Sequence, residues 1–158
     1  MNVTLNRLVV ATACAMVFNV AQAFDTPTTS AAPEALGAAR ALIAEKQWAA
    51  AIDELKRVND KTNADWNNLM GYSHRKASTP DLAAAERYYG EALRLDPKHR
   101  GALEYSGELF LMLGDVARAE QRLAALDKAC FLPCEEYSEL KNAVARFKAN
   151  GNKYAASN

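Results

Sequence analysis

Three alanines, Ala51, Ala85 and Ala119, recur along the chain at a constant spacing of 34 residues. The positions four and seven residues after each alanine are also apolar in all three copies: Leu55, Tyr89 and Leu123, then Val58, Ala92 and Leu126. A fixed period of this length indicates one supersecondary unit copied along the chain, here a pair of helices. The small residue lets two helices approach closely, and the larger residues fill the space between units. The pattern therefore favours a stacked binding scaffold over a catalyst.

The first 23 residues have the layout of a secretory signal peptide. Residues 1–7 carry one positive charge and no acid, residues 8–20 are almost entirely apolar, and Ala21-Gln22-Ala23 is a small-x-small cleavage site. We expect cleavage after Ala23 and export to the periplasm.

Two other interpretations fit this leader less well. A membrane anchor needs about 20 apolar residues, whereas this apolar run is shorter and polar residues 25–30 follow it. A lipoprotein signal would place the lipid on Cys14, but the apolar run before it is short and Ala11 stands where a larger aliphatic residue is usual. We therefore expect no stable membrane anchor.

The chain that remains after cleavage, residues 24–158, carries 18 basic and 19 acidic residues, because Arg7 is lost with the leader. This balance lacks the basic excess of nucleic-acid-binding proteins and the polybasic patch that binds anionic lipid. The chain is long enough to bury one substantial core. Residues 24–33, rich in Thr, Ser, Ala and Pro, are expected to form a flexible lead-in.

Helical periodicity and capping signals divide the rest of the chain into helices, with no strand-like alternation. The first pair is expected at residues 35–45 and 48–58. Thr62 begins a capping-box-like sequence that opens the second pair, and Thr79 followed by Pro80 should begin its second helix. Asp96-Pro97 should end that helix, and Gly114-Asp115 should separate the two helices of the third pair.

A final amphipathic helix is expected at residues 135–150, ended by Gly151. Its apolar residues lie on one stripe, which suits a helix covering the open end of a stack: Tyr137, Leu140, Val144 and Phe147.

Residues 67–72, followed by Ala85, Tyr89, Ala92 and Pro97, resemble the W-x-x-L-G-x-x-Y…A…F…A…P pattern of tetratricopeptide repeats. The third copy resembles it at the same intervals, whereas the first copy has Ala39 in place of the glycine. The spacing from Gly71 to Gly107 is 36 residues, which predicts a turn at 77–80 longer by two and a connection from the first unit to the second shorter by two.

The resemblance implies an all-α fold, a right-handed superhelix of three stacked helix pairs (residues 34–130). A disulfide-linked turn, a capping helix and a tail would follow in residues 131–158. Residues 71–76, 104–109 and 130–136 also resemble a group of small exported bacterial repeat proteins without an assigned activity.

In this family the first helices of the pairs line a concave face where ligands lie. Among the residues that the resemblance would place there, six are the candidates for partner binding: Asn68, Tyr72, Arg75, Lys76, Glu104 and Glu108. One hypothesis is that they bind an extended peptide or protein of the cell envelope. The alternative is a solvated face on which the two bases pair with the two acids. Because these side chains are expected to be exposed, the double change Tyr72→Ala with Arg75→Ala should leave stability nearly unchanged.

Cys130 and Cys134 should close as a disulfide in an oxidising compartment and pin the turn before the last helix. Thiol-redox chemistry is a weaker alternative, because thioredoxin-like pairs have two residues between the sulfurs. His74 and His99 lack the short spacing of zinc ligands.

No catalytic motif was found in the sequence, so no catalytic residue, metal site or cofactor is expected. The sequence favours a non-enzymatic scaffold. A structural or self-associating envelope module, using the second helices of the pairs, and a small-molecule or redox protein remain as alternatives, and oligomers are compatible with each.

Overall fold

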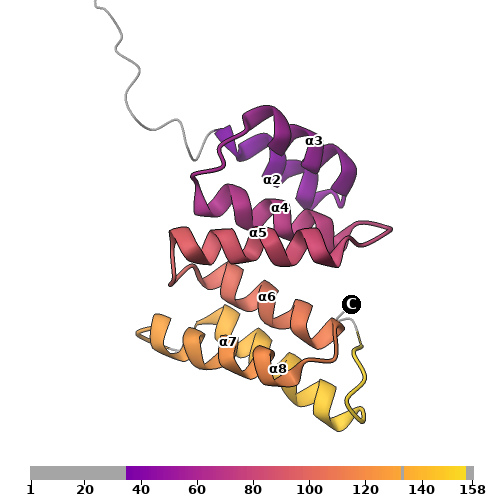
Figure 1. Ribbon diagram of the computed structural model, residues 1–158, viewed down its shortest axis with the longest axis vertical. Coiled ribbons are helices and arrows are strands. Elements are labelled where there is room, and N and C mark those ends of the chain that lie inside the picture. Colours follow the sequence, from indigo (N-terminus) through magenta and orange to yellow (C-terminus); the bar gives the residue numbers. More distant parts are fainter. Residues whose placement is uncertain (1–34, 133, 156–158) are drawn as a thin grey trace, which may run out of the picture.

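The computed structural model describes residues 35–132 and 134–155, and every regular element in these ranges is a helix. The seven helices are α2 (Gly37–Ala44), α3 (Trp48–Val58), α4 (Ala64–Lys76), α5 (Leu82–Leu95), α6 (Arg100–Met112), α7 (Val116–Ala129) and α8 (Glu135–Ala149) (Figure 1). The all-α class is thus confirmed for the described part of the chain. The expected signal peptide, residues 1–23, and the lead-in, residues 24–33, lie outside the described residues.

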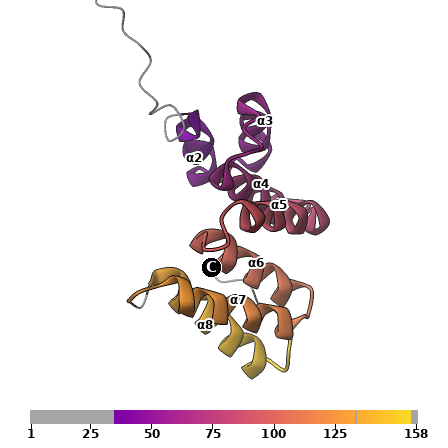
Figure 2. The same cartoon turned by 60° about the vertical axis from the view of Figure 1, so that its left-hand side comes forward.

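The helices pack as sequential pairs, α2 with α3, α4 with α5 and α6 with α7, and α8 closes the stack against α6 and α7. Figures 1 and 2 show the pairs following one another along the long axis of the molecule. Each even-numbered helix also contacts the next even-numbered one, from α2 to α8. The odd-numbered helices form no such series within the described ranges.

The alanines of the 34-residue period are fully enclosed in the packed interior. Ala51, Ala85 and Ala119 are each 0% exposed. Gly71 of α4 is equally confined, because a Cβ atom placed there would lie 2.7 Å from two ring carbons of Tyr89 in α5. The periodic small residues therefore permit the close helix packing that their spacing predicts.

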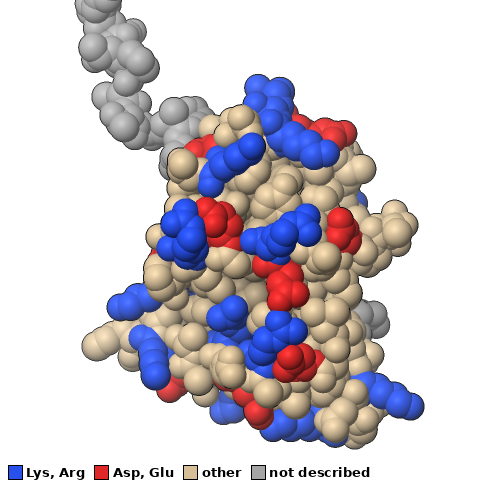
Figure 3. Space-filling model, viewed as in Figure 1, with Lys and Arg blue, Asp and Glu red and all other residues tan. Residues whose placement is uncertain are grey.

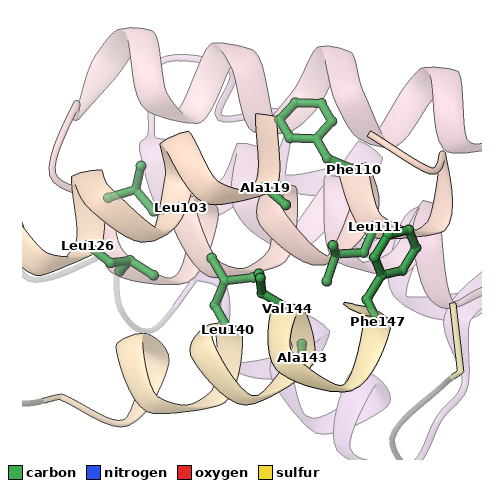
Figure 4. Close-up of a cluster of buried hydrophobic side chains, with 9 residues drawn as sticks. All are labelled: Leu103, Phe110, Leu111, Ala119, Leu126, Leu140, Ala143, Val144 and Phe147. Atoms are coloured by element: carbon green, nitrogen blue, oxygen red, sulfur yellow. The ribbon is translucent and has the colours of Figure 1, made fainter. Parts of the chain in front are cut away.

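The largest part of the core joins the last pair to α8. Figure 4 shows the apolar stripe of α8 facing side chains of α6 and α7. Leu140, Val144 and Phe147 are at most 5% exposed, as the sequence pattern predicted, and Tyr137 packs at the edge. Helix α8 thus covers one end of the stack.

Most of the expected helix limits are confirmed, but two N-caps are not. Helix α3 spans the expected residues, and Asp115 caps α7 by accepting a hydrogen bond from Arg118 N at 3.0 Å. Helix α4 is capped by Asn63, not Thr62, because the Thr62 hydroxyl donates to Asp60 instead. Helix α5 is capped by Asp81, which accepts from Ala84 N at 2.8 Å, so the helix starts after Pro80.

The turns inside the pairs differ in length as predicted. Three residues separate α2 from α3 and α6 from α7, and five separate α4 from α5. In both short turns one residue has a left-handed conformation, Lys46 (φ 59°) and Gly114 (φ 77°), and the next N–H bonds back across the helix end as in the Schellman motif. The shorter spacing between the first and second units comes from a shorter helix and not, as expected, from a shorter connection. Helix α3 has 11 residues, whereas α5, the corresponding helix of the second pair, has 14.

The Sγ atoms of Cys130 and Cys134 are 2.05 Å apart, a bonding distance, in the turn between α7 and α8. Acidic and basic side chains are interspersed on the face drawn in Figure 3. Among the residues described, no helix is long and apolar enough to cross a bilayer.

Candidate functional site

Helices α4 and α6 present facing side chains along neighbouring turns. Tyr72 and Tyr105 have ring centroids 4.6 Å apart, and one turn further on Arg75 Nη1 is 2.6 Å from Glu108 Oε2. Toward the N-terminal ends of the two helices, Asn68 of α4 approaches Gly101 of α6. The Asn68 Nδ2 atom is 3.1 Å from the position that a Cβ atom on Gly101 would occupy. Residues three and four apart share one helix face, which explains this alignment. We call Asn68, Tyr72, Arg75, Tyr105 and Glu108 the α4–α6 surface.

Arg75 is enclosed at one end of this surface, with its side chain 2% exposed. Besides its ion pair with Glu108, it donates from Nε to the Tyr89 hydroxyl at 3.3 Å, and its guanidinium lies 5.4 and 5.5 Å from the Tyr72 and Tyr105 ring centroids. Burial alone would lower the pKa of Arg75, but Tyr89 and Glu108 outweigh it and the net shift is upward. Arg75 is thus a fixed internal charge that orients the rings around it.

Partly buried aromatic rings make up the middle of the surface. Trp48 of α3 meets the Tyr72 ring edge-on at 5.9 Å, and Tyr72 in turn contacts Tyr105. Burial is the main cause that raises the pKa of both tyrosines. Both therefore keep their phenolic protons at neutral pH and present an apolar ring with a hydrogen-bonding hydroxyl.

A carboxyl group, Glu104, lies beside this surface on the side of α8. It is 4% exposed, and burial raises its pKa to about 9, helped by a hydrogen bond with Glu139 of α8 and by the charge of Glu108. Glu104 is therefore protonated at neutral pH. It adds a hydrogen-bonding group and no negative charge.

The structure places five of the six residues predicted from sequence along or beside the α4–α6 surface: Asn68, Tyr72, Arg75, Glu104 and Glu108. Asn68 is 7% exposed, and its Oδ1 has no hydrogen-bond partner among the described residues. Lys76 is exposed and forms no ion pair within the described ranges.

The expectation that these side chains are exposed is wrong for Asn68, Arg75 and Glu104, which are 7%, 3% and 4% exposed. Of the base–acid pairs expected on a solvated face, only Arg75 with Glu108 forms within the described residues, and it forms in the interior. Removing Arg75 would leave the Glu108 carboxylate without its partner, so this change cannot leave stability unaltered.

Sequence reasoning missed Trp48 and Tyr105 as members of this cluster. Tyr105 carried a usable signal, since it lies beside Glu104 in the helix that faces Tyr72. Trp48 belongs to α3, and its contact with Tyr72 depends on how separate helices pack in space.

The two histidines serve the structure. His99 accepts from Ala102 N through Nδ1, which caps α6, and its Nε2 is 2.9 Å from Asp65 Oδ1. Both ring nitrogens are thus occupied. His74 stacks on Tyr88 at 5.5 Å between ring centroids. The described residues contain no group of three or more side chains that could hold a metal ion.

This arrangement can hold an extended chain by ring contacts and hydrogen bonds, and it presents no activated nucleophile. Comparison of the chain with protein-family models, with curated proteins and with solved structures finds no match.

Proposed function

We propose that this protein is an exported, non-enzymatic scaffold of the tetratricopeptide type that binds a protein or peptide of the cell envelope. The observation that carries the proposal is the row of partly buried aromatic rings, Trp48, Tyr72 and Tyr105, arranged around the enclosed Arg75–Glu108 pair. Aromatic residues on a surface supply large contact area at small entropic cost, which is why interfaces are enriched in them.

The packing of the helices supports the repeat architecture. The even-numbered helices contact one another in series and the odd-numbered helices do not, within the described residues. Solenoid proteins curve and use the concave surface for binding. In the tetratricopeptide arrangement that we propose, the even-numbered helices, and with them the α4–α6 surface, would line that concave side.

The more exposed and the enclosed residues of this surface would have different roles in recognition. Tyr72 and Tyr105 offer rings and hydroxyl groups to a partner, and exposed Lys76 adds a positive charge at the edge. Arg75 and Glu108 hold the rings in place, because their charged atoms already pair with each other. The signal-peptide layout of residues 1–23 supports the exported location.

The exposed apolar side chains favour this proposal over assembly through the second helices. Among the described residues, the exposed large hydrophobic side chains are Leu113, Phe131 and Leu132, and all three lie in turns. The outer faces of α3, α5 and α7 therefore lack the apolar patch that a self-associating module would need.

Affinity capture tests the proposal with residues 24–158 as bait, envelope extract as the source and mass spectrometry as the readout. Tyr72→Ala should remove the specific partner. Because the Tyr72 ring packs against Trp48 and Tyr105, the change should also lower the melting temperature, so circular dichroism checks that the bait is folded at the temperature of the capture. Lys128→Ala, an exposed change on α7, is the matched control and should keep the partner. If Tyr72→Ala retains the partner and Lys128→Ala loses it, the binding surface is on the odd-numbered helices and the proposal fails.

A further inference from the structure

A pocket of about 370 Å³ lies where the turn after α3 meets α4 and α5. Pockets that hold small ligands usually measure about 300–1,000 Å³ and combine apolar walls with a few polar groups. We call this cavity the Trp66 pocket. It shares no residue with the α4–α6 surface, and its lining consists of Lys61, Trp66, Asn67, Arg87, Tyr88 and Glu91.

Two aromatic rings form the apolar part of the Trp66 pocket. Trp66 of α4 and Tyr88 of α5 have ring centroids 5.9 Å apart and ring planes at 77°. The indole N–H of Trp66 donates to Leu55 O at 2.7 Å, so the polar atom of that ring is already satisfied. His74 stacks on Tyr88 at 5.5 Å between centroids, which holds the phenol ring in place. The pocket therefore offers two fixed apolar surfaces almost at right angles.

Asn67 fixes the turn that forms one edge of the pocket. It is 2% exposed, and its Nδ2 donates to the backbone oxygens of Lys61 and Asn63, at 2.9 Å each. The turn that carries Lys61 is thus bound to α4 by a side chain from the interior. A ligand that enters a site held in this way loses little free energy to ordering its walls.

The charged residues of the pocket are mainly basic. Lys61 and Arg87 are exposed, and neither forms an ion pair within the described residues. The single acid of the lining, Glu91, accepts two hydrogen bonds from Arg94, at 2.6 and 2.8 Å. Lys61 and Arg87 therefore leave positive charge at the rim of an aromatic cavity, which favours a ligand with a negative group.

We propose that the Trp66 pocket binds a small aromatic carboxylate, with the ring of the ligand against Trp66 and Tyr88 and its carboxylate toward Lys61 and Arg87. Perpendicular aromatic walls offer a flat ring one face-on and one edge-on contact, the two arrangements that aromatic pairs prefer. The planar guanidinium of Arg87 matches the geometry of a carboxylate. A single negative charge suits the site, because Glu91 repels a more highly charged group. This inference goes beyond the proposed function, since it adds a small-molecule ligand to a protein-binding scaffold.

NMR titration of the whole chain, labelled with nitrogen-15, with cinnamate tests the proposal. The chain contains two tryptophans, and they lie in different surroundings: Trp66 lines the pocket, whereas Trp48 contacts Tyr72. The indole N–H signal of Trp66 and the amides of residues 61–67 and 87–91 should shift and reach saturation. The indole signal of Trp48, identified by its loss in Trp48→Phe, should stay in place.

The contribution of charge is measured with cinnamamide, which has the same ring and no charge. It should bind about tenfold more weakly than cinnamate, the effect of two exposed ion pairs. Lys61→Ala combined with Arg87→Ala should weaken cinnamate by the same factor and leave cinnamamide unchanged. Glu91→Gln should strengthen cinnamate binding about threefold, because it removes the acid of the lining and frees Arg94. Lys128→Ala, an exposed change on α7, is the matched control and should behave as the unaltered chain.

Equal binding of cinnamate and cinnamamide would overturn the inference, as would shifts that grow without saturation or that centre on Trp48. The absence of shifts in a folded chain would overturn it too, and the dispersion of the amide spectrum reports folding in every sample. The outcome is independent of the affinity capture, because that experiment depends on Tyr72 and this one on residues of the Trp66 pocket. Either proposal can fail while the other stands.

Discussion

Replacing Gly71 with alanine tests how tightly the second helix pair is packed. The added methyl group would lie 2.7 Å from both Cδ1 and Cε1 of the Tyr89 ring, well inside normal carbon–carbon contact. Tyr89 is 1% exposed, and its hydroxyl accepts a hydrogen bond from Arg75. The ring is confined by the core along its length and by this bond at its tip, so it cannot move aside without a cost.

The expected change in stability combines two opposing terms. Forcing an extra methyl group into a well-packed core costs up to about 3 kcal/mol. Alanine is a better helix former than glycine by about 1 kcal/mol in a helix interior. Because Gly71 lies within α4, the clash should exceed the propensity gain, and we expect Gly71→Ala to lower the free energy of unfolding by about 2 kcal/mol.

Gly90→Ala is the matched control. Gly90 also lies inside a helix, α5, but is exposed, and a Cβ there would have no atom within 4 Å. Only the propensity term remains, so this variant should gain about 0.5–1 kcal/mol. Urea unfolding followed by circular dichroism measures both. A Gly71→Ala protein as stable as the parent, alongside a stabilised Gly90→Ala protein, would refute the steric argument.

Three further predictions concern charge and covalent bonding. Arg75→Ala should lower the free energy of unfolding by about 3 kcal/mol or more, because Glu108 keeps a largely buried charge without its partner; a loss below about 1 kcal/mol in urea unfolding would mean that solvent screens the pair. The pKa of Glu104, near 4.5 in the unfolded chain and about 9 in the folded one, means that the folded state holds a proton that the unfolded state releases. Stability should therefore fall as pH rises from about 5 to 9, by at most about 1.4 kcal/mol per pH unit. Glu104→Gln should remove that component from thermal melts recorded across the range, and unchanged pH dependence would contradict the assignment. Replacing Cys130 and Cys134 together with serine should cost about 2 kcal/mol, the entropy of a small closed loop; intact mass before and after reduction shows whether the bond is present, and equal stability of the variant would show that it contributes nothing.

The helices could be predicted because their signals are local. The stripe of Leu140, Val144 and Phe147 needs only the helical period to be recognised, and Asp115 is a capping residue directly after a glycine. The prediction of the N-cap residue was wrong for α4, where two candidate residues are adjacent in the sequence. Thr62 and Asn63 can both accept from a helix N-terminus, and the choice depended on the bond from Thr62 to Asp60.

The burial of Arg75 could not be predicted from its own helix. Periodicity places Tyr72 and Arg75 on one face of α4, but it does not say what covers that face. The cover comes from Tyr89 of α5 and from Tyr105 and Glu108 of α6. An arginine in a helical repeat is usually solvated, and only the tertiary arrangement supplies enough partners to enclose this one.

The packing of Tyr154 against the core of α6, α7 and α8 also bears on how the molecule unfolds. In an ideal repeat array each unit touches only its neighbours, so stability is a sum of unit and interface terms and the ends can fray independently. Here the segment after α8 folds back onto the core that α8 shares with α6 and α7. Fraying of α8 must therefore also release Tyr154 from this core. Amide exchange in α8 should therefore be slower than in α2 at the opposite end, and Tyr154→Ala should remove part of that protection.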